Sequence, residues 1–192
     1  DDIWSVDGAG AVGHWDGMSW MVRTSAGSPV QLNSIWEHKP GNVTAVGAEG
    51  RILHLNPAGS QFGDVTNVTN SLNSIWGVGS DDYWIVGGMG TILRVTMSAA
   101  KAPSPVSTDL WSIWGSSSSD VWAVQPSGTT SSLRGLWGSG ASAIWAVGEG
   151  GIVLQWNGSG WAPVTTGCTP TLLGVWASLS GDVWAVGASG TI

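Results

Sequence analysis

The chain has 192 residues, with 13 acidic and 6 basic side chains, a net charge of −7, and only 10 % charged residues. So few basic residues exclude a nucleic-acid footprint and attraction to an anionic membrane, and no run of residues is apolar enough to span a bilayer. We therefore expect a folded domain with no nucleic-acid partner and no membrane insertion. Low charge with abundant Ser, Thr and Gly favours an extracellular or cell-surface location.

One six-residue phrase, close to Asp-Val-Trp-Ala-Val-Gly, recurs along the chain. Its second position falls at residues 3, 43, 83, 121, 144 and 183, in steps of 40, 40, 38, 23 and 39. A second tryptophan stands eight residues before the third position of five copies, at Trp36, Trp76, Trp114, Trp137 and Trp176. Such constant spacing indicates one hairpin repeated along the chain.

The repeat over residues 133–171 shows the pattern most fully. It contains four short apolar runs, which we name strands a, b, c and d in chain order: Leu133–Trp137, Ala143–Val147, Gly151–Trp156 and Trp161–Val164. Glycine-rich or Asn-Gly links separate strands b, c and d, as in tight hairpins. No stretch has helical periodicity, and four antiparallel strands in about 40 residues are typical of a β-propeller blade.

The sequence thus predicts an all-β chain, a β-propeller of four-stranded antiparallel blades. We expect a single domain over residues 1–192, with about six repeats and five to seven blades. The approximate repeats are 1–31, 32–71, 72–109, 110–132 (truncated), 133–171 and 172–192 (partial). Because the first repeat starts at strand b and the last stops within strand c, the pattern favours a piece of a longer propeller.

Most of the 15 tryptophans follow the repeat. Ten lie at the a and b positions, four at c and d positions, and only Trp111 lies outside the pattern. A buried aromatic ring removes about 150–250 Å² from water, and 15 exposed indoles would form larger apolar patches than a monomer tolerates. The spacing therefore predicts that these rings pack between neighbouring blades.

The fourth repeat is too short for a complete blade. Only eight residues separate Val124 from Leu133, so strands c and d have no sequence to form them. Either a real deletion leaves a two-stranded sheet, or a strand-bearing segment is missing from the sequence. An open sheet edge is a liability, which favours the second alternative.

The motif Leu-x-Gly-Val-Trp-x-Ser-x-x-x-Asp-Val-Trp-Ala-Val-Gly-x-x-Gly-Thr-Ile, found with small gaps at 172–192 and again around 110–124, carries a family likeness. It resembles the tryptophan-rich propeller repeats of secreted and surface proteins in myxobacteria and related bacteria. More distantly, it is similar to sialidase-like repeats and to photosystem II assembly-factor propellers. The resemblance covers essentially the whole chain and implies a propeller fold, which serves lectins, scaffolds, adhesins and enzymes alike.

Catalytic chemistry has little support in the sequence. The resemblance to sialidases would imply a tyrosine nucleophile and an arginine cluster, but Tyr83 falls at a core position of strand b and the four arginines occupy different strand types. We expect no enzyme, no catalytic residue and no cofactor. A glycoside hydrolase or lyase is the least favoured function.

The polar residues of the repeat have simpler interpretations. An aspartate recurs just before strand b, which predicts a turn role in which its carboxylate accepts backbone N–H bonds; a ring of carboxylates binding a cation is the alternative. These residues are Asp2, Asp82, Asp120 and Asp182. His14, His38 and His54 show no metal-ligand spacing, so we expect packing or hydrogen bonds to a neighbouring blade, and no metal. Cys168 is a lone loop thiol.

We therefore expect a non-catalytic binding or scaffold propeller for a protein or glycan partner at the cell surface. The candidate ligand-binding residues are Trp15, Asp16 and Trp20, repeated as Trp156, Asn157 and Trp161. An indole plate beside an Asp or Asn side chain is the chemistry that holds a sugar, although core packing and turn formation would use the same residues. The alternatives are a lectin-type carbohydrate-binding propeller and a structural subunit of a larger surface assembly.

Overall fold

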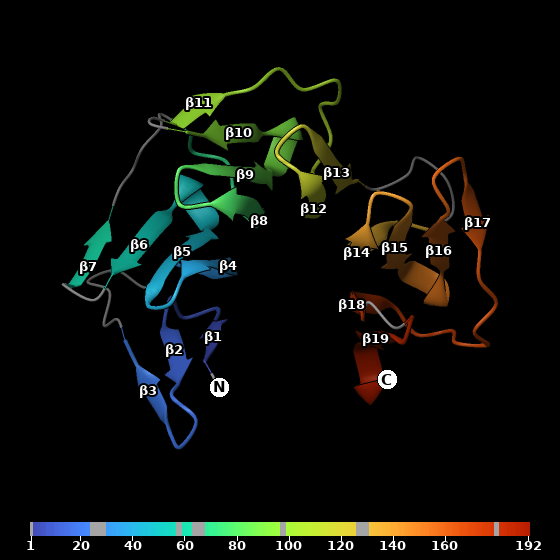
Figure 1. Cartoon of the computed structure of the whole chain (residues 1–192), viewed down its shortest axis with the longest axis horizontal. Helices are drawn as coiled ribbons and strands as arrows, with labels where there is room; N and C mark the ends of the chain where they lie inside the picture. The colour runs from blue at the N-terminus through green and yellow to red at the C-terminus, as the bar shows by residue number, and fades with distance from the viewer. Residues whose placement is uncertain are drawn as a thin grey trace. The chain divides into compact units, whose positions relative to one another are not determined.

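The computed structural model describes residues 2–23, 30–56, 59–62, 68–96, 99–125, 131–178 and 181–192. The described residues form 19 strands in six antiparallel sheets, and within each sheet the strands pair in chain order (Figure 1). We number these sheets blades 1 to 6 along the chain. Blades 2, 3 and 5 have four strands each, so the predicted all-β blade architecture is confirmed.

The chain divides into two compact units, Asp1–Ser107 and Thr108–Ile192, which are described separately. Unit 1 contains blades 1 to 3. Blade 1 consists of β1 (Ile3–Val6), β2 (Val12–Trp15) and β3 (Trp20–Val22). Blade 2 consists of β4 (Leu32–Lys39), β5 (Asn42–Gly47), β6 (Ile52–Asn56) and β7 (Gly59–Phe62). Blade 3 consists of β8 (Leu72–Gly79), β9 (Asp82–Gly87), β10 (Ile92–Val95) and β11 (Ala99–Lys101).

Unit 2 contains blades 4 to 6, of which only blade 5 has four strands among the described residues. Blade 4 consists of β12 (Ser112–Ser117) and β13 (Asp120–Val124). Blade 5 consists of β14 (Leu133–Gly140), β15 (Ala143–Gly148), β16 (Val153–Trp156) and β17 (Trp161–Pro163). Blade 6 consists of β18 (Leu172–Ala177) and β19 (Val183–Gly187). Among the described residues, no strand c or d joins blade 4 after Val124, as the spacing predicts.

Short 3-10 turns make the links between strands b and c. They are η1 (Ala48–Gly50), η2 (Gly88–Gly90), η3 (Glu149–Gly151) and η4 (Ala188–Gly190). The last glycine of η3 has a φ of 72°, and a Cβ there would overlap the carbonyl oxygen of Cys168. Only glycine meets both conditions, which is why this link is glycine-rich.

Pairing between strands a and b explains the constant eight-residue spacing of the tryptophans. In four blades two tryptophans lie directly opposite each other: Trp76 with Trp84, Trp114 with Trp122, Trp137 with Trp145, and Trp176 with Trp184. In blade 2 the partner of Trp36 is Thr44. Residues that face each other on an antiparallel pair project on the same side of the sheet, so each pair gives its blade one aromatic face.

The buried core is aliphatic rather than aromatic. Its fully buried side chains come mainly from strands b and c, and include Val43, Val46, Ile52, Ile85, Leu93, Ile144 and Val147. Trp114 is buried, whereas the other tryptophans are half-buried or exposed. The prediction of fully packed indoles is therefore too strong. A ring of this size is seldom enclosed completely, and here it lines the aliphatic core.

The strand-a indoles nevertheless connect consecutive blades. A Cβ on Gly77 would lie 2.7 Å from Cη2 of Trp36, and one on Gly138 would lie 2.5 Å from Cη2 of Trp114. At the next junction, Nε1 of Trp137 donates a hydrogen bond to the carbonyl oxygen of Ala177 at 3.0 Å. In each case the indole meets the small residue that directly follows the strand-a tryptophan of the next blade.

Candidate functional site

The first predicted triad lies at the hairpin between β2 and β3. Trp15 and Trp20 are cross-strand neighbours, with ring centroids 6.0 Å apart and planes tilted by 46°. Trp20 is 55 % exposed, whereas Trp15 is half-buried. This pair presents one indole to the surface with a second one supporting it.

Asp16 has a structural role in this hairpin. Its Oδ1 accepts hydrogen bonds from the backbone N–H groups of Met18 at 2.8 Å and Ser19 at 2.9 Å. These bonds hold the pKa of Asp16 below its ordinary value, and the bond from Ser19 has the larger effect. Gly17, at φ 96°, completes the turn, so one carboxylate oxygen is committed to the loop.

The second triad forms an equivalent hairpin between β16 and β17. The centroids of Trp156 and Trp161 are 5.7 Å apart. Trp122 from blade 4 joins them, with centroids 5.1 Å from Trp156 and 6.1 Å from Trp161. Oδ1 of Asn157 accepts hydrogen bonds from Ser159 N, Ser159 Oγ and Gly160 N at 2.8–3.1 Å. Here the aromatic pair contacts a neighbouring blade, and ligand binding by either triad stays a prediction.

The hydrogen bonds described for the carboxylates of the aspartates before strand b join them to side chains, whereas the prediction was a turn role with backbone N–H donors. Oδ1 of Asp2 lies 2.5 Å from Nε2 of His14, and Asp82 accepts two hydrogen bonds of 3.2 Å from Arg94. His14 and Arg94 both lie on strand c of the same blade as their aspartate. Asp120 accepts hydrogen bonds from Ser116 and Trp122, and Asp182 accepts one from Ser178. All four carboxylates are thus hydrogen-bonded to side chains. In blades 1 and 3 the side chain that bonds the carboxylate, His14 or Arg94, lies on strand c.

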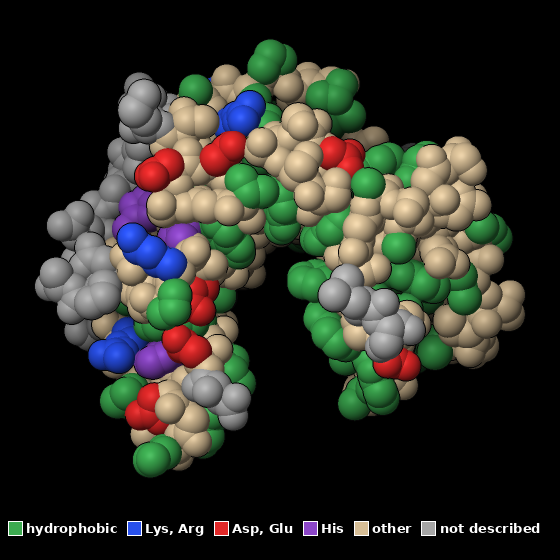
Figure 2. All heavy atoms as spheres, in the orientation of Figure 1, with side chains coloured by type: hydrophobic (Ala, Val, Ile, Leu, Met, Phe, Trp, Pro, Cys, Tyr) green, Lys and Arg blue, Asp and Glu red, His purple; other side chains and the backbone are tan. Residues whose placement is uncertain are grey.

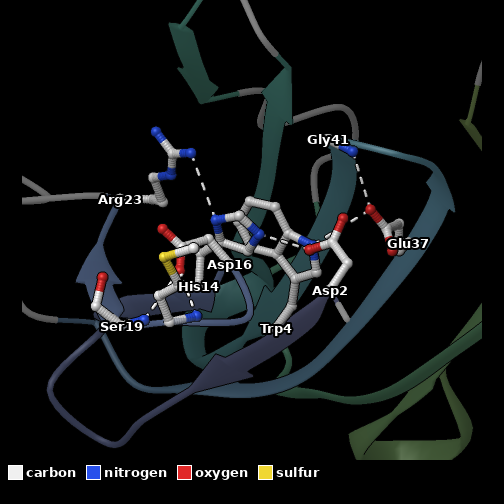
Figure 3. Close-up of polar contacts among 9 residues, drawn as sticks. Asp2, Trp4, His14, Asp16, Ser19, Arg23, Glu37 and Gly41 are labelled. Atoms are coloured by element: carbon white, nitrogen blue, oxygen red, sulfur yellow. Dashed lines mark hydrogen bonds and ion pairs between the residues drawn. The ribbon is translucent and has the colours of Figure 1, made fainter.

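His14 forms a small polar cluster on blade 1 (Figure 3). Its ring stacks on Trp4 with centroids 4.2 Å apart, and its Nδ1 lies 3.4 Å from Nη2 of Arg23. Nε1 of Trp4 donates to Oε1 of Glu37 on blade 2 at 3.2 Å. Of the two predicted roles for His14, the structure shows packing, on Trp4; the hydrogen bonds described for His14 remain within its own blade, and Trp4 makes the link to the next one.

A second polar cluster lies between blades 2 and 3. Oγ1 of Thr44 is 2.5 Å from Nε2 of His38 and 2.9 Å from Nδ1 of His54, and its side chain is hydrogen-bonded to that of Tyr83. Burial lowers the pKa of His38 to about 4, lowers that of His54, and raises that of Tyr83 to about 12. His38 and Tyr83 bridge the two blades, and all three titratable groups stay neutral near pH 7.

A groove in unit 2 was not predicted as a site. It has a volume of about 690 Å³ and is lined by strand-a ends of blades 4, 5 and 6. Each blade contributes one Trp-small-Ser triplet: Trp114 with Ser116, Trp137 with Ser139, and Trp176 with Ser178. The sequence signal was available, since the triplet Trp-Gly/Ala-Ser occurs three times at one repeat position. The role predicted for those tryptophans was packing alone.

Unit 2 carries only five charged residues: Asp109, Asp120, Arg134, Glu149 and Asp182. Arg134 is ion-paired to Glu149, and none of the five lines the groove. Figure 2 shows the visible surface of unit 2 covered mainly by hydrophobic and other uncharged side chains. Among the described residues, no group of three or more His, Cys, Asp or Glu side chains could hold a metal ion.

No family model and no curated protein sequence matches the chain. Solved structures do match. The extracellular domain of the putative one-component system BT4673 from B. thetaiotaomicron has a TM-score of 0.70 at 12 % identity, over 96 % of this chain and 30 % of that one. YCF48 from Cyanidioschyzon merolae has a TM-score of 0.70 at 14 % identity, over 98 % and 77 %.

Two further structures extend this result. The WD40 β-propeller domain of Doa1 has a TM-score of 0.55 at 12 % identity, over 98 % of this chain and 86 % of that one. A structure of YCF48 bound to D1 peptide has a TM-score of 0.54 at 17 % identity, over 97 % and 57 %. The chain spans less than a third of the BT4673 domain. At these identities the likeness shows the fold alone, and that fold is the β-propeller.

Proposed function

We propose that the protein is a non-catalytic binding propeller, and that the groove in unit 2 holds an extended, uncharged segment of a protein partner. The groove itself carries this proposal, because three indoles and three hydroxyls recur along it at repeat spacing. Indoles offer flat apolar surface, and serine hydroxyls can hydrogen-bond a peptide backbone. Its volume of about 690 Å³ is in the range of ordinary ligand sites.

The chemistry of the lining favours a neutral ligand. Ser116 donates its hydroxyl proton to Asp120, and a serine oxygen whose proton is donated in this way can still accept from a ligand N–H. Since no charged side chain lines the groove, a charged segment would lose its hydration without gaining an ion pair. An extended peptide with small or apolar side chains fits these conditions.

The comparisons support this proposal without establishing it. One similar propeller has been solved with a peptide bound, and propellers as a class host many functions. We further propose an extracellular or cell-surface location, supported by the low charge and by the similar extracellular domain. Among the described residues, no helix has the length and apolarity needed to cross a membrane.

Selection from a displayed random-peptide library on the immobilised chain tests the groove. Affinity of the selected peptides is then measured by fluorescence anisotropy for Gly140→Trp and for the matched control Gly79→Trp. A Cβ meets nothing within 4 Å at either position, so both variants should fold, but only Gly140 lines the groove. We expect at least a tenfold loss for Gly140→Trp and none for Gly79→Trp. Equal affinities, or no selected peptide, would overturn the proposal.

A glycan ligand at Trp15 and Trp20 is the second candidate, because Trp20 is 55 % exposed and an exposed indole can stack on a sugar ring. A glycan array probed with the wild-type chain and with Trp20→Ala tests it, and Trp161→Ala is the control in the equivalent hairpin. Binding that Trp20→Ala alone abolishes supports a lectin, and an array without signal excludes this candidate. A structural subunit of a surface assembly would instead co-purify with a stable partner.

A further inference from the structure

Blade 4 lacks the sequence for its outer half. Eight residues separate Val124 from Leu133, whereas 24 separate Val147 from Leu172 in the next repeat. In blades 2, 3 and 5, strand b pairs with strand c on its outer side. Among the described residues, β13 pairs with β12 only (Figure 1). Eight residues are too few for the links and the strands c and d that occupy 24 residues in the next repeat.

Side-chain burial falls at the positions that strand c covers elsewhere. Ala123 is exposed, whereas the residues at its repeat position in the four-stranded blades are 0 % exposed: Ala45, Ile85 and Ala146. Val121 is half-buried, and its equivalents are at most 3 % exposed: Val43, Tyr83 and Ile144. Strand b of blade 4 therefore carries apolar residues at positions that are buried in the four-stranded blades, and in blade 4 these residues are exposed or half-buried.

The backbone of β13 is oriented to accept another strand. The carbonyl oxygen of Val124 accepts a hydrogen bond from N–H of Trp111 at 2.9 Å, which places the polar groups of Val124 on the side of β12. Backbone groups alternate along a strand, so those of Ala123 and Val121 face the opposite, outer side. In blade 2 the equivalent side is the one on which β5 pairs with β6.

Blade 3 shows which residue such a strand would need. Arg94 of strand c lies directly opposite Trp84, its guanidinium is 5.0 Å from the indole centroid, and it donates two hydrogen bonds to Asp82. Blade 4 has Asp120 and Trp122 at the positions of Asp82 and Trp84. An incoming arginine would meet an aspartate and an indole at the same positions, although here Asp120 also accepts hydrogen bonds from Ser116 and Trp122, and the Trp122 ring also contacts Trp156 and Trp161.

We propose that β13 is a docking site for a β-strand of a partner protein, which completes blade 4 as an added strand c. The matching segment is extended and basic, with the pattern apolar-Leu-Arg-apolar. Its main chain pairs with Val121 and Ala123, its leucine covers Ala123, and its arginine binds Asp120 and stacks on Trp122. Strand addition to an open sheet edge is an established mode of peptide recognition. Unit 2 has four acidic residues and one basic residue, which favours a basic segment.

The test uses a fluorescein-labelled peptide, Gly-Thr-Ile-Leu-Arg-Val-Thr, which copies residues 90–96. We expect saturable anisotropy on titration with the full chain, and new hydrogen-exchange protection of the amides of Val121 and Ala123. Ala123→Pro removes the outward N–H without using a β12 hydrogen bond, and should weaken binding at least tenfold. Ala123→Ser keeps this N–H and should bind as the wild type does. A peptide with glutamate in place of arginine should lose most of its affinity.

Several results would overturn the proposal. The first is the absence of saturable peptide binding, and the second is equal peptide affinity of Ala123→Pro and the wild type. The third is a loss of peptide affinity in Ala185→Pro, on β19, without a loss in Ala123→Pro. Self-association of the chain that Ala123→Pro abolishes would assign the edge to a second copy, and would also contradict a partner strand. Gly140→Trp should leave this binding unchanged, so the edge and the groove fail or succeed separately. A native far-ultraviolet circular dichroism spectrum of Ala123→Pro confirms its fold.

Discussion

Gly138 of blade 5 lies against the ring of Trp114 of blade 4, and this contact leaves no room for a side chain at position 138. Trp114 lies so close that a Cβ on Gly138 would come within 2.5–2.7 Å of three of its ring atoms. Trp114 is buried. We expect Gly138→Ala to lower the free energy of unfolding by about 1–3 kcal/mol through overpacking, measured by chemical denaturation.

Gly140→Ala is the matched control on the same strand, because its Cβ would meet nothing within 4 Å. Its effect should stay within about 0.5 kcal/mol. Two variants of equal stability would show that the indole moves aside, and would remove the contact between Trp114 and Gly138 as a constraint on the fold.

The histidines between blades 2 and 3 should make stability depend on pH. Burial lowers the pKa of His38 from 6.5 to about 4, so below pH 6.5 the unfolded chain takes up a proton that the folded chain excludes. The stability that neutral His38 contributes to the fold is therefore fully present above pH 6.5, and it is lost as the pH falls toward 4. We expect the melting temperature to fall over this interval, and to fall less steeply for His38→Gln, followed by differential scanning calorimetry. A parallel decline in both proteins would exclude His38 as the cause.

At the scale of elements, the c–d hairpins depend on Asx side chains that the sequence also offered as ligand groups. Oδ1 of Asn157 accepts three hydrogen bonds from Ser159 and Gly160. Asn157→Ala removes this acceptor and should cost about 1 kcal/mol, whereas Asn157→Asp keeps it. Thermal melting of the two variants makes the comparison. Unchanged stability of Asn157→Ala would leave the side chain available for a ligand role.

The strands could be predicted because the sequence pattern of each strand occurs in several repeats. The strands of blade 5 and the missing half of blade 4 follow from spacing and from turn residues such as Gly158. The candidate site could not be predicted in the same way. The groove depends on three triplets meeting side by side, and the cluster at Thr44 depends on Tyr83 arriving from the next blade. Proximity of this kind arises from packing between repeats, on which a spacing pattern carries no information.

At the scale of the whole molecule, a single domain over residues 1–192 remains a prediction beside the two compact units. In repeat proteins, stability passes from each repeat to its neighbours. We therefore expect Gly138→Ala to accelerate amide exchange most in β12, β14 and β18, and also measurably in β8 and β9 of unit 1, in hydrogen-exchange mass spectrometry. Acceleration of amide exchange in unit 2 alone would show that the two units unfold independently. It would contradict the prediction of a single domain and indicate two.

The contact between a strand-a indole and the small residue of the following blade also bears on how such a chain can change in length. The protruding ring and the recess that receives the previous ring occupy adjacent positions, as in Trp137 with Gly138 and Trp176 with Ala177. Duplication of one blade copies both halves of the joint together, and loss of one blade removes both. Where a small residue follows the strand-a tryptophan, as in blades 3 to 6 but not at Glu37 of blade 2, the new neighbours then fit without further substitution, so gene segments coding for such blades can be gained or lost while the junctions stay compatible.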